Sequence, residues 1–177
     1  VGETLRQELF TDGPTAILTS ATLSVGKKSS FDHLRRRIGL TTGHEKQLGS
    51  PFNYKEQATL ILLDGMPDPS DKLAYEQATA AMVERYVERS GGRAFVLFTS
   101  YDMLRRVAER ITPFLIREKL QLVSQADGTP RGRMVELFKE NPRSVLFGTD
   151  SFWQGVDVPG DALQNVIITK LPFAVPD

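Results

Sequence analysis

The sequence contains no cysteine and only two histidines, His33 and His44, among its 177 residues. Without cysteine, this chain cannot form disulfides, thiolate zinc sites or cysteine-ligated iron–sulfur clusters, and it fits a reducing compartment. The two histidines are too few and too isolated to suggest a metal site. The composition therefore excludes the common metal-binding and disulfide-stabilised classes of domain.

Net charge is also lacking, because 22 lysines and arginines balance 22 aspartates and glutamates. No overall positive field attracts nucleic acid or an anionic membrane, so any contact with phosphate must be local. No apolar run approaches the roughly 20 residues that cross a bilayer, and the amino end has no signal pattern. These absences predict a globular, cytoplasmic protein without a membrane partner, and 40% hydrophobic residues suffice for its core.

The two ends of the sequence suggest that it is a piece of a longer polypeptide. Val1 is not an initiator residue, and the final "KLPFAVPD" stops in a proline-punctuated loop without a closing helix. We therefore expect further chain on both sides.

Short apolar runs alternate with stretches of helical periodicity. The runs that predict buried strands are residues 15–21, 58–64, 93–100, 120–125, 144–149 and 165–170. A first helix is expected between a cap at Ser29 or Ser30 and a stop at Gly39. A long helix opens at residues 68–70 and ends at Gly91. Its expected apolar face is formed by Ala74, Ala78, Met82 and Tyr86.

Two more predicted helices continue the alternation of strands and helices. Apolar residues from Leu104 to Leu115 have helical spacing, and Thr129 before Pro130 predicts a cap for a helix that buries Met134 and Phe138. Strands that alternate with helices and are apolar on both faces predict an α/β fold, a mostly parallel sheet with helices on both faces.

In such a sheet, the loops that leave the carboxyl ends of the strands form the ligand-binding edge. Three of these loops are polar: residues 99–101, 125–127 and 149–160. By contrast, "VGKKSS" is not a phosphate-binding loop, because Ala21 stands where its first glycine belongs and Lys28 where Ser or Thr should hold Mg²⁺. The run Arg35–Arg37 is interpreted as a solvated helix face.

Four phrases occur in an order and spacing that resemble the DinG and XPD branch of superfamily-two helicases. "TSATL" at residues 19–23 resembles the third helicase motif, and "AFVLFTSY" at 94–101 the fourth. "GTDSFWQGVDVPGDAL" at 148–163 resembles the fifth motif, and "KLPF" at 170–173 is its usual successor. One such phrase is weak evidence, but four in sequence are strong.

The resemblance implies a RecA-like, P-loop-NTPase-like lobe that is incomplete at its carboxyl end. Residues 1–24 would be the last strand and third motif of the preceding lobe, and residues 25–177 the second lobe, truncated before the sixth motif. ATP and Mg²⁺ are the implied cofactors of the full-length protein, and any iron–sulfur cluster would lie outside this segment. The implied partners are single-stranded DNA and the N-terminal lobe of the same chain. The implied role is that of a DNA motor in repair or replication.

By resemblance, the fifth motif touches both nucleotide and DNA. Gly155 lets backbone approach a ligand. Asp157 offers a carboxylate to a ribose hydroxyl or to lobe closure, unless it simply caps the turn around Pro159. Thr149 and Ser151 offer hydroxyl and N–H groups to DNA phosphates. Trp153 is interpreted either as a relay or base-stacking surface, or as a packing residue that seals the loop.

The remaining candidate residues lie in the other motifs. Thr99, Ser100 and Tyr101 are assigned to DNA, with helix capping as a compatible alternative, and Gln125 is assigned to DNA from its position, or else faces solvent. The resemblance places Ser20, Ala21 and Thr22 in the cleft between lobes, where they couple hydrolysis to movement, unless they simply end an edge strand. Gln154 stands where this branch often has Glu, which puts a charged coupling role there in doubt.

Two other classes of function stay open. One is a non-catalytic RecA-like interaction module, which an upstream sequence without a phosphate loop would favour. The other is a nucleotide-binding metabolic enzyme, but no dinucleotide glycine fingerprint follows any of the strands. The fragment alone lacks the phosphate loop, the acidic Mg²⁺ box and the arginine motif, so we expect no ATP hydrolysis from it.

Overall fold

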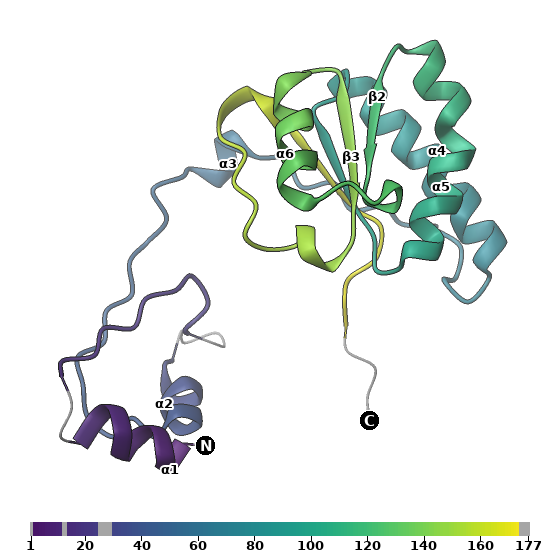
Figure 1. Cartoon of the computed structure of the whole chain (residues 1–177). Helices are drawn as coiled ribbons and strands as arrows, with labels where there is room; N and C mark the ends of the chain where they lie inside the picture. Colours follow the sequence, from purple (N-terminus) through teal and green to yellow (C-terminus); the bar gives the residue numbers. More distant parts are fainter. Residues whose placement is uncertain (1, 12–13, 25–29, 174–177) are drawn as a thin grey trace. The chain divides into compact units, whose positions relative to one another are not determined.

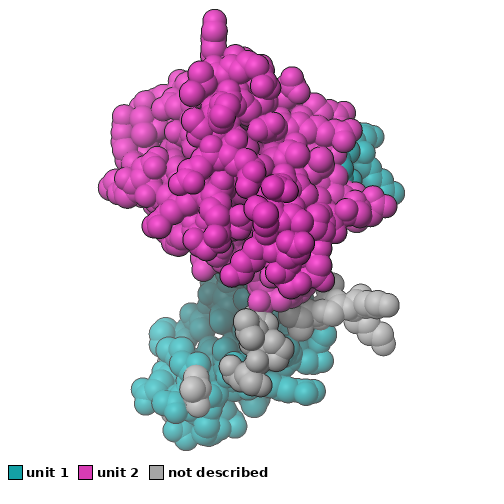
Figure 2. All heavy atoms as spheres, turned by 90° about the vertical axis from the view of Figure 1, so that its right-hand side faces the viewer, with its two compact units in different colours: residues 1–61 teal, residues 62–177 magenta. Residues whose placement is uncertain are grey.

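The computed structural model describes residues 2–11, 14–24 and 30–173 of the chain. It divides into two compact units, residues 1–61 and 62–177, which have different colours in Figure 2. The domain boundary expected between residues 24 and 25 stays a prediction, because residues 25–29 lie outside the described part. No helix in the described residues is long and apolar enough to cross a bilayer.

The first unit contains short helices joined by extended chain. Its elements are α1 (Gly2–Leu5), the π-helical turn η1 (Arg6–Thr11), α2 (Asp32–Ile38) and α3 (Tyr54–Gln57). The helix predicted before Gly39 is confirmed, since Gly39 ends α2 in the left-handed region at φ 74°. Phe31, not Ser30, is the residue before α2, and no side chain caps this helix, so the cap predicted at Ser30 is wrong. The Ser30 hydroxyl still accepts a hydrogen bond from the Asp32 N–H at 3.0 Å, and Ser29 lies outside the described residues.

Two of the six predicted strands are wrong. Residues 15–21 and 58–64 form no strand, and their side chains are exposed. A strand exists only when a neighbouring strand receives its backbone hydrogen bonds, and none of the described strands lies beside either segment. Apolar sequence alone was therefore an insufficient basis for the prediction.

The second unit is an α/β domain, as predicted, and Figure 1 shows its layers. Its strands are β1 (Ala94–Leu97), β2 (Gln121–Ser124), β3 (Ser144–Gly148) and β4 (Asn165–Ile168). All the pairings among them are parallel, in the order β2-β3-β1-β4. The main helices are α4 (Lys72–Ser90), α5 (Tyr101–Arg117) and α6 (Arg131–Glu140). The 3-10 turns are η2 (Gln125–Asp127), η3 (Asp150–Phe152) and η4 (Gly160–Ala162).

The central strands β1 and β3 are buried on both faces, because helices cover both sides of the sheet. Alternate strand residues therefore enter two different cores. Val96 and Phe98 pack with α4 and α5. Phe95 and Leu146 pack with α6. This arrangement confirms the predicted fold class, a parallel sheet with helices on both faces, and is consistent with a RecA-like domain.

Two local predictions in this unit are wrong. The buried face of α4 contains Tyr75, Thr79, Val83 and Val87, while the predicted face is only half-buried. Both faces have helical spacing, so periodicity did not distinguish the smaller alanine face from the one that meets the sheet. At α6, Pro130 is the residue before the helix and no side chain caps it, so the cap predicted at Thr129 does not form. The fixed backbone of Pro130 starts the helix instead.

Candidate functional site

The three polar loops follow β1, β2 and β3, which are adjacent and parallel in the sheet. Their carboxyl ends therefore meet at one edge, as the sequence predicts. The pairing of β1 with β3 continues to this edge, since the Phe98 N–H donates to the Gly148 carbonyl at 2.9 Å. Thr149 is buried at the start of its loop, while Ser151, Gly155 and Asp157 are exposed further along it.

Gln125 links two of these loops. Its Oε1 accepts from the Thr149 N–H at 2.7 Å and from the Thr149 hydroxyl at 3.0 Å, and its Nε2 donates to Ser151 Oγ at 3.0 Å. The structure therefore brings together three of the residues assigned to DNA. Gln125 orients the Thr149 and Ser151 hydroxyls, a role that sequence position did not indicate.

The third loop begins α5. Ser100 accepts a hydrogen bond from the Met103 N–H at 3.3 Å, so it caps the helix, as the alternative interpretation expected. Tyr101 is the first helical residue and is 45% exposed. A free aromatic face beside a helix start is suited to contact with a ligand, because the first N–H groups of a helix have no partner within the helix.

Trp153 joins the loop after β3 to the end of β1. Its indole N–H lies 3.4 Å from the Phe98 carbonyl oxygen, and its half-buried ring packs against the core on the α6 side of the sheet. The neighbouring Phe152 is buried and presses on Gly148, where a Cβ atom would lie 2.6 Å from the Phe152 ring. Packing thus accounts for one side of Trp153, and its role in coupling or stacking stays a prediction.

Gly155 has φ 67°, a left-handed conformation that favours glycine. Its carbonyl and that of Gln154 both accept hydrogen bonds from Arg131 Nη2, each at 2.7 Å. Arg131 is the first residue of α6, and sequence reasoning missed this contact, because the two segments are more than 20 residues apart. The Gln154 side chain is exposed, so the presence of Gln in place of Glu changes a solvent-facing group.

A pocket of about 320 Å³ lies beside the start of α5. Thr99 and Ser100 line it together with Lys72 of α4 and Lys170 of the segment after β4. An ion pair between Arg106 and Glu76, at 2.9 Å, lines it as well. The Glu76 carboxylate is buried, and helical periodicity does not indicate that the buried face of α4 contains an acid.

Tyr75 fixes the same end of α4 to the sheet. Its hydroxyl donates to the Thr169 carbonyl oxygen, just after β4, and burial raises the pKa of the Tyr75 phenol above its usual value. The Thr169 hydroxyl in turn donates to the Leu97 carbonyl at 3.0 Å. Thr169 therefore links β4 to the carboxyl end of β1, where the pocket opens.

Ser20, Ala21 and Thr22 lie in the first unit, in an exposed turn. The Ser20 hydroxyl accepts from the Thr22 N–H and lies within hydrogen-bonding distance of the Thr22 hydroxyl, both at 3.2 Å. These contacts are local, and they leave the turn accessible. The role of the three residues in coupling stays a prediction.

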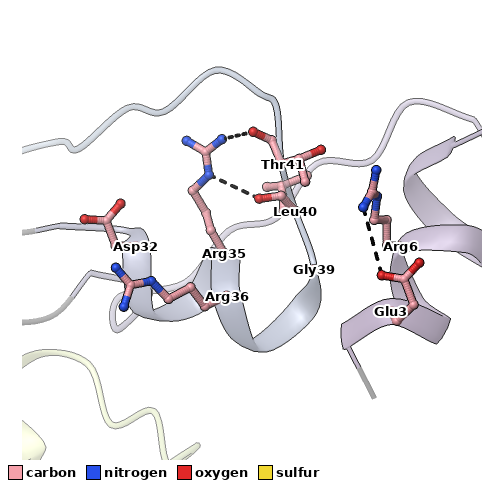
Figure 3. Close-up of a pocket in the computed structure, with 8 residues that line it drawn as sticks. All are labelled: Glu3, Arg6, Asp32, Arg35, Arg36, Gly39, Leu40 and Thr41. Carbon is pink, nitrogen blue, oxygen red and sulfur yellow. Dashed lines mark hydrogen bonds and ion pairs between the residues drawn. The ribbon is translucent and has the colours of Figure 1, made fainter.

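The first unit has a pocket of its own, of about 310 Å³, shown in Figure 3. Arg35 donates to the carbonyl oxygens of Leu40 and Thr41, at 3.3 and 2.6 Å, and thereby ties down the chain that follows α2. Arg36 and Arg37 are exposed, which agrees with a solvated helix face. Within the described residues, no group of three or more histidines, aspartates and glutamates is placed to hold a metal ion.

The chain is similar to known proteins along nearly its whole length. The family described as helicase C-terminal domain matches residues 83–177. ATP-dependent DNA helicase YoaA of Haemophilus influenzae is 43% identical over 162 residues, covering 91% of this chain and 24% of that protein. YoaA of Escherichia coli is 38% identical over 172 residues, which cover 97% of this chain and 26% of that protein.

A relative with a different printed activity is 3'-5' exonuclease DinG of Bacillus subtilis. It is 35% identical over 182 residues, which cover 99% of this chain and 19% of that protein. The chain thus spans about a quarter or less of the length of these relatives.

Proposed function

The chain belongs to the family of helicase C-terminal domains, and from this premise we propose that it is the second motor lobe of an ATP-dependent, DinG-like DNA helicase. In the whole protein, ATP binding draws two lobes together and hydrolysis releases them, which moves the motor along single-stranded DNA and separates the duplex. The fragment alone is inactive, because the ATP phosphates and Mg²⁺ are held by residues of the other lobe.

One observation carries this proposal: the three polar loops meet at one sheet edge, where hydrogen bonds join the loop after β2 to the loop after β3, and the loop after β3 to the end of β1. Gln125 joins Thr149 to Ser151, and Trp153 reaches the carbonyl of Phe98 at the end of β1. We therefore expect a movement of the loop after β3 to be transmitted to Gln125 and to the end of β1 through these hydrogen bonds. This is the mechanical property that a lobe with two ligands requires.

The DNA side of the proposed site consists of Thr99, Ser100, Tyr101 and Ser151. Gln125 supports Ser151 and occupies the N–H and hydroxyl of the buried Thr149, so Thr149 contributes to the site by holding Gln125 in place. Hydroxyl and N–H groups suit phosphate oxygens and read no base sequence. Tyr101 and Trp153 are each candidates for an aromatic surface on which a base of single-stranded DNA stacks. The net charge of zero is compatible with this assignment, because the contacts are local.

The nucleotide side consists of Gly155 and Asp157, which are exposed at the far end of the same loop. The Asp157 carboxylate accepts a hydrogen bond from a ribose hydroxyl. Gln154 and the turn at Ser20, Ala21 and Thr22 belong to the surfaces that meet when the lobes close. Because the proposed motor acts on DNA, we assign the whole protein to DNA repair or replication. We place it in the cytoplasm.

Replacing Asp157 by alanine in the full-length protein tests the proposal. We expect DNA-stimulated kcat/KM for ATP to fall about tenfold, equivalent to about 1.4 kcal/mol, while the Kd for single-stranded DNA changes less than about twofold. Asp161→Ala is the matched control, because Asp161 is another exposed acid on the same connection between β3 and β4. Unchanged ATPase with weakened DNA binding would refute the nucleotide assignment.

The isolated 177-residue chain gives the companion measurement. It should show no ATP hydrolysis above buffer, with or without single-stranded DNA. DNA-stimulated turnover by this fragment would contradict its role as one half of a two-lobed motor.

A further inference from the structure

The Arg131 side chain lies across the backbone at Gly155, the point where the loop after β3 reverses direction. Arg131 Nη2 has two hydrogens, and the structure directs one to each of two successive carbonyl oxygens, those of Gln154 and Gly155, at 2.7 Å. Two successive carbonyls converge on one nitrogen only where the backbone curves sharply. The left-handed φ of Gly155 provides that curvature.

This contact fixes more than the carbonyls. All peptide bonds of the described residues are trans, so the N–H of each planar peptide points away from its own C=O. The carbonyl of Gln154 shares its peptide with the N–H of Gly155, and the carbonyl of Gly155 shares its peptide with the N–H of Val156. Arg131 on one side therefore aims both N–H groups to the other side.

Neither of these N–H groups donates to a backbone or side-chain acceptor within residues 2–11, 14–24 and 30–173. Because the two carbonyls converge on one nitrogen, the two N–H groups diverge on the opposite side of the backbone, where each is available to a separate acceptor. The exposed Asp157 follows directly after Val156, so this pair lies next to the carboxylate assigned above to ribose.

Arg131 is itself well anchored. It begins α6, and its guanidinium carbon lies 5.8 Å from the centre of the Phe152 ring, which is buried against Gly148. The guanidinium is planar and always charged, so it holds the same carbonyls at any pH in the working range. Its side chain is exposed, and no carboxylate in the described part of the chain pairs with it.

We infer that Arg131 is a positioning residue that holds the turn at Gly155, and with it the nearby Asp157 carboxylate, in the conformation that binds nucleotide. The inference rests on the proposed function, which places nucleotide at Gly155 and Asp157. It adds a residue from a different segment, the start of α6, to the nucleotide site. Arg131 touches the loop and not the nucleotide.

The test compares Arg131→Ala, Arg131→Lys and Arg133→Ala in the full-length protein. Arg133 is the matched control, because it lies on the same helix and, within the described part of the chain, its side chain bonds to Glu136 and Glu140 instead of to the loop. We expect Arg131→Ala to raise the KM for ATP and the Kd for ADP about tenfold, with kcat lowered less than threefold. Arg131→Lys should recover part of the loss, since an ammonium donates hydrogen bonds without the planar fork. Arg133→Ala should leave all three values within twofold.

A thermal unfolding midpoint measured for each variant separates positioning from folding. Because the Arg131 side chain is exposed, we expect the midpoints of all three variants to stay close to the parent. Unchanged KM and Kd in Arg131→Ala would overturn the inference. So would equal losses in Arg131→Ala and Arg131→Lys that follow a lowered unfolding midpoint, because that pattern indicates a purely structural arginine.

Asp157→Ala distinguishes this failure from failure of the proposed function. If Asp157→Ala impairs ADP binding and Arg131→Ala does not, only the positioning role is wrong. If neither variant changes ADP binding, nucleotide does not bind at this loop and the proposed site falls together with the inference.

Discussion

Two segments of this chain have nearly the same apolar content and opposite structures. Residues 94–98, "AFVLF", form the buried strand β1 and the residue after it, whereas residues 60–63, "LILL", are exposed and form no strand. The strand β1 has β3 on one side, β4 on the other, and helices on both faces. An apolar run therefore favours burial, and its neighbours decide the structure.

The largest expected change in stability comes from removing one apolar side chain from the buried segment, and we compare it with the same change in the exposed one. Phe98 is fully buried with its ring centre 4.9 Å from that of Phe147, so Phe98→Ala should lower the free energy of unfolding by about 3–5 kcal/mol. Leu62 is 82% exposed, so Leu62→Ala should change it by less than about 0.5 kcal/mol. Denaturant unfolding of the chain, followed by circular dichroism, measures both. A loss of several kcal/mol from Leu62→Ala would show that residues 58–64 are buried after all.

Two glycines repeat the comparison, because neighbouring atoms enclose Gly148 but not Gly49. In Gly148→Ala the new Cβ would lie 2.6 Å from the buried Phe152 ring, so we expect a loss of about 1–3 kcal/mol and displacement of the loop that follows. At Gly49, in the first unit, a Cβ would meet no atom within 4 Å, and Gly49→Ala should be within about 0.5 kcal/mol of the parent.

The same unfolding experiment measures both glycine variants. A neutral Gly148→Ala would mean that Phe152 moves aside freely and does not anchor the loop. That result would also weaken the case for Arg131, whose guanidinium lies over the same ring.

The fold of the second unit was predictable because its signals were local and repeated. Strands β1 to β4 follow the apolar runs, and Gly91 ends α4 in the left-handed region as expected. The structures of residues 15–21 and 58–64 were not predictable in the same way, because a strand depends on partners that sequence periodicity does not reveal. The buried face of α4 was missed for a related reason, since only the sheet selects between two faces of helical spacing.

The site was predictable in its location but not in its connections. The polar loops at the carboxyl ends of parallel strands indicated the edge, and the structure places Thr149, Ser151 and Gln125 together there. The contacts of Arg131 with Gln154 and Gly155 link residues more than 20 positions apart. No pattern of residue types marks such a contact before the fold brings the two segments together.

Two ion pairs, one in each unit, extend the comparison of buried and exposed regions to charged groups. The Arg106 guanidinium lies 2.9 Å from the Glu76 carboxylate, which is only 8% exposed, so Arg106→Ala leaves a buried acid without its partner. We expect a loss of about 1–2 kcal/mol, and a smaller loss in the double variant Arg106→Ala with Glu76→Gln. The Arg35–Glu45 pair of the first unit is open to water, so Glu45→Ala should cost less than about 1 kcal/mol. Equal losses in the two units would show that burial of Glu76 is unimportant.

The smallest expected effect concerns two tyrosines, Tyr75 in the second unit and Tyr54 in the first. The buried Tyr75 hydroxyl donates to the Thr169 carbonyl, so Tyr75→Phe should cost about 1 kcal/mol at neutral pH. Tyr54 is exposed, and Tyr54→Phe should cost less.

The pH dependence of stability tests the burial of Tyr75 further. Burial raises the pKa of Tyr75 in the folded chain, so as pH rises past the usual tyrosine pKa of about 10, the unfolded chain loses this proton first. The contribution of Tyr75 is therefore complete below that pH and is lost as pH rises toward the folded-state value. The difference in unfolding free energy between parent and Tyr75→Phe should shrink over this alkaline range. A difference for Tyr75→Phe that stays constant would mean that its phenol is open to water, and that the start of α4 is packed no better than the first unit.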